Sequence, residues 1–149
     1  MLIEQAGLKI GLIGVTTSVA LRSALAPNVR GLDLAPLAPA IETEAKALRQ
    51  KDAQVIVVTA HAGGRCAKFA SPVDLSSCDG SSEIFEVARA LPAGLVDAIV
   101  AGHTHQGLAH IVNGVAIIEA FWGGRAFGRV DVVVDRGTGK VVEIRPLAP

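Results

Sequence analysis

Apolar residues form three continuous runs in the first two thirds of the chain, at 8–15, 54–59 and 96–101. Each run is short and rich in β-branched residues, which is typical of strands. A run without polar alternation, such as 54–59, predicts a strand that is covered on both faces. We therefore expect three buried strands, of which 8–15 starts the sheet and ends at Thr16 and Thr17.

Between these runs, apolar residues recur at helical spacing in two segments. One helix is predicted to begin with Pro39 in its first position, and a second to extend from Ser81 until Pro92 stops it. The apolar faces of the two helices consist of Ile41, Ala45 and Leu48, and of Ile84, Val87, Ala88 and Leu91. Strands that alternate with helices predict parallel pairing through right-handed crossovers. The strands that end at Thr59 and Ala101 should therefore run in the same direction.

The last third of the chain has a different pattern, which predicts antiparallel hairpins. Asn113-Gly114 separates 111–112 from 115–118, and this dipeptide between apolar runs is a strong signal for a two-residue hairpin. A second hairpin is predicted from 128–134 and 140–144. The fold class is therefore α/β, with parallel strands first and antiparallel hairpins at the C-terminal end.

Length and charge limit the classes of function. The chain has 149 residues and is 50% hydrophobic, which suits a single domain over 1–149. Lys plus Arg and Asp plus Glu both number 14, so no excess positive charge favours a nucleic acid polymer as partner. The apolar runs are shorter than the roughly 20 residues that span a bilayer. Residues 1–5 lack the features of a secretory signal.

Three of the four histidines follow predicted parallel strands. His61 comes after the second run, and His103 and His105 come after the third. Ligands bind at the carboxyl ends of such strands, and in an extended backbone residues two apart project to the same side. One such histidine alone is usually a hydrogen-bonding loop residue, but three at one edge indicate a site for zinc, manganese, iron or nickel. His110 precedes a hairpin and is expected only to form hydrogen bonds.

Cys66 and Cys78 lie in a long loop over 62–80, and loops of this length are usually functional. A disulfide between them would stabilise the loop by roughly 3 kcal/mol and would indicate an oxidising compartment. Two reduced thiols are an equally good interpretation. A zinc site with His61 is a weaker one, because the two cysteines lack the close spacing of zinc knuckles.

Other candidate residues have weaker patterns. Arg125, after Gly123-Gly124, can contact a substrate phosphate, although a glycine pair before a strand is more often a turn. Asp97 lies inside a predicted strand, and helix starts or loops explain Asp74, Asp79 and Glu83. The sequence contains no convincing carboxylate pair or Ser-His-Asp set, and we assign no catalytic residue.

Two segments resemble the last two metal motifs of the calcineurin-like metallophosphoesterases: 59–64, Thr-Ala-His-Ala-Gly-Gly, and 101–106, Ala-Gly-His-Thr-His-Gln. The flanking segments resemble the 5′-nucleotidase and UDP-sugar hydrolase branch of that superfamily. They are 9–14, 113–115 and 124–128. The resemblance covers nearly the whole chain.

The resemblance implies a four-layer α/β/β/α sandwich that hydrolyses phosphate esters, often of nucleotides, with two divalent ions of Mn, Zn, Fe, Ni, Mg or Ca. By position, His61 and His103 would bind one ion and His105 the other. The partner would be a small phosphate ester or nucleotide. Members of this branch are commonly exported, so a periplasmic or extracellular location is expected, in agreement with a disulfide between Cys66 and Cys78.

The sequence also departs from the family pattern. The Asp-x-His, Gly-Asp-x-x-Asp and Gly-Asn-His motifs with which the family begins do not occur here. We therefore expect the C-terminal portion of a catalytic domain, completed by an N-terminal half or a homodimer, with the nucleotide-binding C-terminal domain also absent. A related phosphodiesterase or thiosulfate-ester hydrolase branch fits equally. The alternative is a non-catalytic metal-binding or interaction module.

Overall fold

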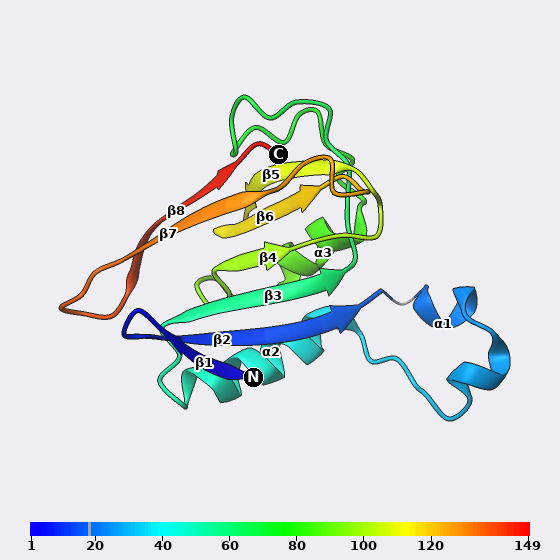
Figure 1. The fold of residues 1–149 in the computed structure, drawn as a ribbon, viewed down its shortest axis with the longest axis horizontal. Coiled ribbons are helices and arrows are strands. Elements are labelled where there is room, and N and C mark those ends of the chain that lie inside the picture. Colours follow the sequence, from blue (N-terminus) through cyan, green and yellow to red (C-terminus); the bar gives the residue numbers. More distant parts are fainter. Residues whose placement is uncertain (18) are drawn as a thin grey trace.

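A six-stranded mixed sheet is the centre of the computed structural model, which describes residues 1–17 and 19–149 (Figure 1). The strand order is β1-β2-β3-β4-β6-β5. The strands of this sheet are β1 (Leu2–Gln5), β2 (Leu8–Thr16), β3 (Val55–His61), β4 (Ala98–Val100), β5 (Gly107–Val112) and β6 (Val115–Ala120).

The central strands are parallel, as the sequence predicts. β2 pairs with β3 from Ile10 opposite Val55 to Thr16 opposite His61, and β3 pairs with β4. The hairpin over Asn113-Gly114 is confirmed as β5 and β6, but β6 also pairs in parallel with β4. The first hairpin therefore completes the parallel sheet.

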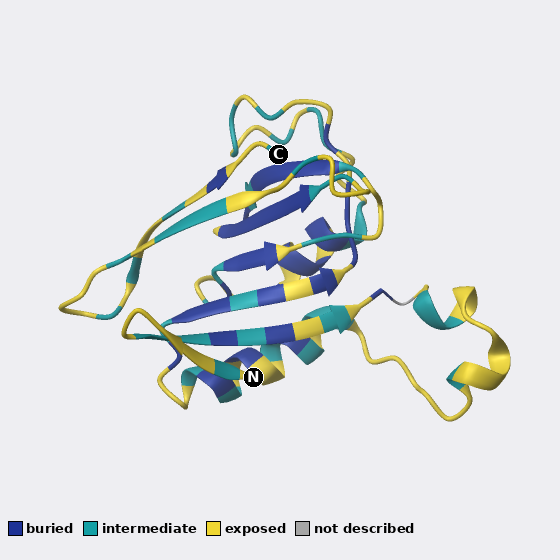
Figure 2. Cartoon of the chain, viewed as in Figure 1, coloured by how far each residue is buried: buried dark blue, intermediate teal, exposed yellow. Residues whose placement is uncertain are grey.

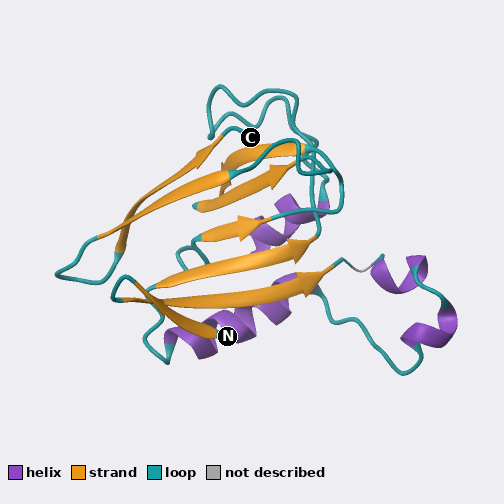
Figure 3. Ribbon diagram, in the orientation of Figure 1, coloured by secondary structure: helices purple, strands orange, loops and turns teal. Residues whose placement is uncertain are grey.

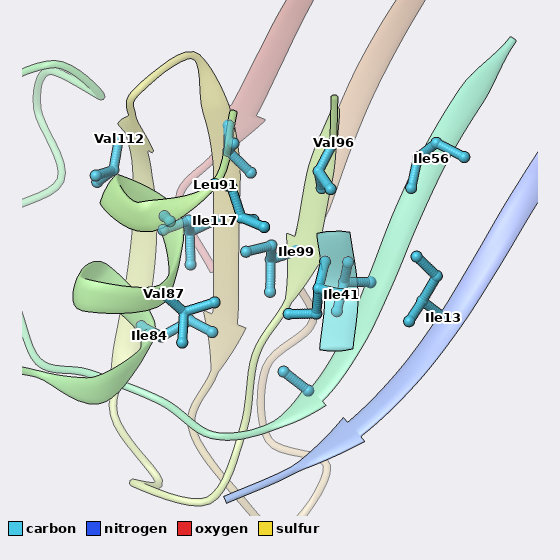
Figure 4. Close-up of a cluster of buried hydrophobic side chains, with 14 of the residues drawn as sticks. Ile13, Ile41, Ile56, Ile84, Val87, Leu91, Val96, Ile99, Val112 and Ile117 are labelled. Carbon is cyan, nitrogen blue, oxygen red and sulfur yellow. The ribbon is translucent and has the colours of Figure 1, made fainter. Parts of the chain in front are cut away.

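Two helices cover one face of the sheet, α2 (Leu37–Arg49) and α3 (Glu83–Ala90) (Figure 3). Their apolar faces are as predicted, and Ile41 and Ile84 point toward Ile56 and Ile99 of the strands in the core (Figure 4). Helix α2 begins two residues before Pro39, which the first helical turn tolerates because its amide groups have no partners inside the helix. No helix in the described residues is long and apolar enough to cross a membrane.

The second predicted hairpin forms a separate two-stranded sheet of β7 (Arg129–Val134) and β8 (Val141–Leu147). It packs against β5 and β6 on the face opposite the helices (Figure 1). A Cβ atom on Gly128 would overlap Ile118 of β6, so glycine permits this close approach. Thr59 of β3 and Val100 of β4 are exposed, and Figure 2 shows exposed segments near the ends of these two strands.

Three features differ from the sequence prediction. The run 8–15 does not start the sheet, because β1 pairs with it in antiparallel fashion through a turn in which Ala6 and Gly7 have φ of 51° and 77°. The third run contributes only three residues of strand, β4. Two short helices that the sequence analysis did not anticipate, α1 (Ala20–Ser23) and η1 (Ala26–Val29), lie between β2 and α2.

Candidate metal centre

His61 and His103 come together at the carboxyl edge of the sheet. His61 is the last residue of β3, and His103 lies in the loop that follows β4, the strand paired with β3. Nδ1 of His103 is 3.1 Å from Nε2 of His61, and the ring centroids are 4.7 Å apart at an interplanar angle of 62°. Both side chains are exposed, so an ion can reach them from solvent.

The spacing of the two nitrogens fits a shared ion. Metal–nitrogen bonds of about 2.0–2.1 Å place two ligand nitrogens roughly 2.9 Å apart in octahedral geometry and roughly 3.4 Å apart in tetrahedral geometry. The observed 3.1 Å lies between these values. Without an ion, one ring can donate its N–H to the other.

His105 lies apart from this pair, and the expectation of an extended backbone at this point is wrong. His103 and His105 have φ of 78° and 58°, because the loop after Gly102 turns through left-handed conformations. The ring of His105 lies 6.4 Å from that of Trp122. Over 1–17 and 19–149, the three histidines do not form a three-ligand cluster.

Arg125 packs against Trp122, whose ring also lies near that of His105. Its guanidinium carbon lies 3.3 Å from the centroid of the Trp122 ring and 5.6 Å from that of Phe121. A guanidinium over an aromatic face is attracted by the electron-rich ring and keeps its N–H groups free for an anion. Arg125 and His105 therefore have Trp122 as a common neighbour, and His105 lies apart from the His61–His103 pair.

Glu119 is a site residue that the sequence analysis missed. It lies on β6 and is 2% exposed, and its carboxylate is within 2.9 Å of the Thr104 hydroxyl, which also reaches the Gly64 carbonyl. The amide groups of Gly64 and Gln106 donate to it at 3.4 Å. The available signal was a single charged residue in the apolar run of β6. Glu119 thus ties the loop after β3 to the loop that carries His103 and His105.

The contact between Glu119 and Thr104 also requires a glycine at position 63. A Cβ atom there would lie 2.5 Å from the Glu119 carboxylate and 2.6 Å from the Thr104 hydroxyl. Only glycine lets the two loops approach this closely.

Hollows open on two sides of the histidine pair. A cavity of about 400 Å³ is lined by Gly63, Arg65 and His103 among others. An open hollow of about 570 Å³ lies over the free face of the sheet and is lined by Thr59, His61 and Val100 among others. The pair can therefore be approached by a small molecule.

The remaining acidic candidates have structural roles. The Asp97 carboxylate accepts the Ile56 amide at 2.6 Å and a guanidinium N–H of Arg49 at 2.9 Å, and burial raises its pKa despite these contacts. Asp74 and Asp79 accept hydrogen bonds from Ser76 and Ser81, and these bonds lower the pKa of both carboxyls. These contacts account for all three carboxylates.

Cys66 and Cys78 are joined by a disulfide and form an isolated antiparallel bridge within the long loop. The alternative that grouped the cysteines with His61 is wrong, because the histidine beside the sulfurs is His110. His110 lies in β5 and is fully buried, so desolvation lowers its pKa. Its Nδ1 accepts the Ala109 amide at 3.2 Å, and the nearby Lys68 backbone opposes the effect of burial on the pKa, but among the described residues Nε2 has no hydrogen bond of good geometry.

Comparisons with known proteins extend this picture. No family model matches the chain. It is 28% identical over 142 residues to the endonuclease YhcR of Bacillus subtilis, which covers 95% of this chain and 11% of the relative. It is also 28% identical over 141 residues to the cell wall protein Lmo0130 of Listeria monocytogenes, covering 93% of this chain and 18% of the relative. The chain thus spans less than a fifth of either relative.

Solved structures share the fold. A 5′-nucleotidase of Staphylococcus aureus in complex with α-ketoglutarate aligns at a TM-score of 0.70 with 21% identity, covering 99% of this chain and 29% of that one. The sulfate thiohydrolase SoxB of Thermus thermophilus aligns at a TM-score of 0.73 with 17% identity, covering 99% of this chain and 24% of that one. The calcineurin-like phosphoesterase YfkN of Bacillus subtilis aligns at a TM-score of 0.71 with 20% identity, covering 95% of this chain and 44% of that one. The chain shares the mixed α/β fold of these three structures, one of which is a calcineurin-like phosphoesterase, and this is the fold class that the sequence predicts.

Proposed function

We propose that the chain is the C-terminal part of a two-metal phosphoesterase domain, in which His61 and His103 bind one ion and His105 the other. The observation that carries the proposal is the 3.1 Å separation of the His61 and His103 ring nitrogens at the sheet edge. A pair of divalent ions in such a site would activate the attacking oxygen and neutralise charge on the phosphoryl group.

The roles of the chain's other residues follow from their positions. Arg125 is proposed to contact a substrate phosphate, and its position against Trp122, which also lies near His105, supports this role. Glu119 links the loop that follows His61 to the loop that bears His103 and His105. The bridging carboxylate is assigned to a segment outside this sequence, or to a second copy, because the described residues offer no carboxylate clustered with these histidines.

The substrate is proposed to be a small phosphate ester or a nucleotide, since solved structures that share the fold include a 5′-nucleotidase and a phosphoesterase. The cell wall protein among the relatives and the Cys66–Cys78 disulfide support a location outside the cytoplasm.

The test is hydrolysis of AMP and p-nitrophenyl phosphate with added Mn²⁺ or Zn²⁺, by the chain and by a His103→Ala variant. Removing a metal ligand should reduce metal-dependent activity by roughly 100-fold and weaken binding of one ion in a calorimetric titration. Arg136→Ala, in the exposed turn between β7 and β8, is the control and should retain both properties. Equal activity and equal ion binding in wild type and His103→Ala would refute the proposal.

A second function rests on the same geometry. Because no carboxylate joins the histidine pair among the described residues, the chain can bind an ion without catalysing hydrolysis. In that case His103→Ala would reduce ion binding, and neither protein would hydrolyse the esters. Addition of a segment that carries the absent aspartates would then distinguish the two hypotheses. A fragment of an enzyme would gain activity, whereas a binding module would remain inactive.

A further inference from the structure

A second cluster of metal-binding side chains lies away from the sheet edge, around the disulfide. One ligand atom from each of Cys66, Cys78 and His110 lies within 4.8 Å of the other two. Two of these residues are buried and Cys78 is half-buried, so the cluster is enclosed but can be reached from solvent. Among residues 1–17 and 19–149, this is the one place where three or more His, Cys, Asp or Glu side chains lie close enough together to hold a metal ion.

The buried imidazole of His110 is a second observation that indicates a bound ligand. The side chain is fully buried, and among the described residues Nε2 has no hydrogen bond of good geometry, although the Lys68 backbone lies near enough to the ring to raise its pKa against the effect of burial. An unsatisfied buried polar atom costs about 1–3 kcal/mol, so such atoms call for a specific explanation. The ring of Phe69, with its centroid 6.0 Å from that of His110, encloses the imidazole further.

The three residues are held together by backbone bonds that do not depend on the disulfide. The Ala67 amide donates to the Ser77 carbonyl at 3.1 Å, and the Asp79 amide donates to the Arg65 carbonyl at 2.9 Å. These two bonds flank the cysteine pair on either side. The Ile111 amide, next to His110, donates to the Pro72 carbonyl of the same loop at 2.7 Å. Breaking the sulfur–sulfur bond therefore leaves both thiols beside the imidazole.

We propose that Cys66, Cys78 and His110 form a zinc site that is closed by the disulfide and opened by its reduction. A dithiol reductant gives two electrons and two protons to the sulfur–sulfur bond and becomes a disulfide itself, leaving two protein thiols. The ion then displaces both thiol protons and is bound by two thiolates and one imidazole nitrogen. Two sulfurs and one nitrogen with a position left for water form a common tetrahedral zinc set.

The geometry requires only small movements. In a tetrahedral site with zinc–sulfur bonds of about 2.3 Å, the two sulfurs lie roughly 3.8 Å apart. Cross-strand neighbours in an antiparallel pair have side chains that can span this distance without moving the backbone. Ligation through Nε2 moves the ring proton to Nδ1, so the Ala109 amide loses its 3.2 Å bond, which is at the long end of the hydrogen-bond range, and the metal–nitrogen bond has to offset that loss.

Cobalt is the probe that tests the site, because thiolate ligation gives a sulfur-to-metal charge-transfer absorption that imidazole and carboxylate ligands do not. The full chain is reduced with a dithiol, exchanged into buffer without air and titrated with Co²⁺. We expect one ion per chain with this absorption in the reduced protein and none in the oxidised protein. The His61–His103 site cannot mimic the result, since it contains no sulfur.

Variants identify the third ligand. His110→Gln should weaken cobalt binding by roughly tenfold or more, since loss of even a supporting group in a metal site costs about that much. Val73→Ala, which lies in the same loop, is 70% exposed and changes no ligand, is the matched control and should bind as the wild type does. Cys66→Ser should abolish the charge-transfer absorption.

Three results would overturn the proposal. The first is a reduced, folded chain without thiolate absorption on cobalt addition. The second is a His110→Gln variant that folds, as judged by circular dichroism, and binds cobalt as tightly as wild type. The third is thiolate absorption that develops only after the reduced chain has unfolded, which would show chelation by two free thiols.

Discussion

Glu119 is the penultimate residue of β6, an otherwise apolar strand, and contacts both the loop that follows His61 and the loop that carries His103 and His105. Burial of a carboxylate is unfavourable unless hydrogen bonds replace its lost water. Here the Thr104 hydroxyl and the amides of Gly64 and Gln106 replace it. Glu119, whose charge is unexpected in the apolar sequence of β6, thus links the loop that follows His61 to the loop that carries His103 and His105.

We predict that Glu119→Gln destabilises the chain by about 1–3 kcal/mol, because one acceptor oxygen becomes an NH₂ group that faces backbone donors. The loosened 102–106 loop should also weaken ion binding at the histidine pair by roughly tenfold. Chemical denaturation measures the first effect and calorimetric titration the second.

Glu143→Gln on β8 makes the same chemical change at an exposed position and is the control for Glu119→Gln. If the two variants were equally stable and bound ions equally well, Glu119 would have no positioning role.

Individual site residues differ in how far sequence reasoning could find them. His61 and His103 were predicted because each follows a strand of a parallel pair, and register alone brings such ends together. The position of His105 was missed because left-handed φ values in its loop cannot be read from a His-x-His spacing. Glu119 was missed because its partners lie 13 and 55 residues away in the chain.

At the scale of elements, Asp97 links three parts of the fold. It immediately precedes β4, accepts the Ile56 amide of β3 and pairs with Arg49 of α2. Arg49 also donates to the carbonyl groups of Ala53, Gln54 and Leu95, so its charge has partners besides the carboxylate. The crossover from helix to strand is therefore fixed by hydrogen bonds as well as by apolar packing.

Because burial raises the pKa of Asp97, the folded chain binds its proton more tightly than the unfolded chain does. Its contribution to stability is therefore complete below the unfolded value of 3.8 and decreases as the pH rises through the folded pKa. We predict that Asp97→Asn, which keeps an acceptor for Ile56, changes stability by less than about 1 kcal/mol at pH 7.

The stability of Asp97→Asn relative to wild type should increase as the pH rises from 3 to 7, as measured by denaturation at several pH values. The exposed aspartates with lowered pKa are present in both proteins, so their effects cancel in this difference. Asp97→Leu, which removes the acceptor, should cost about 1–3 kcal/mol at every pH. A difference between wild type and Asp97→Asn that moves in the opposite direction with pH would contradict the argument.

The elements that sequence reasoning found are those with strong periodicity. β2, β3, α2, α3 and both hairpins follow from apolar runs, helical spacing and Asn113-Gly114. β1 was missed because Leu2–Gln5 has only four residues, two of them polar, and its place is fixed by pairing with β2. The parallel pairing of β6 with β4 is a tertiary contact for which a local hairpin pattern contains no signal.

At the scale of the whole molecule, the main sheet is covered unequally. Helices α2 and α3 pack against one face, whereas β7 and β8 pack against β5 and β6 on the other face and leave part of that face open (Figure 1). The open part includes Val100, which is 46% exposed, beside the hollow that contains His61. Apolar sheet surface of this kind is usually a contact surface in a soluble protein.

We predict that the isolated chain self-associates through this open face, because burial of apolar surface stabilises association by about 25 cal/mol per Å². Val100→Lys should shift the chain toward monomer, as measured by light scattering across a range of concentrations, since a lysine in the contact would have to be desolvated. Val73→Lys, in the long loop and 70% exposed, adds the same charge away from the sheet and should leave the distribution unchanged. A wild-type chain that is monomeric at every concentration and unfolds cooperatively would show that the open face is stable in water without a partner.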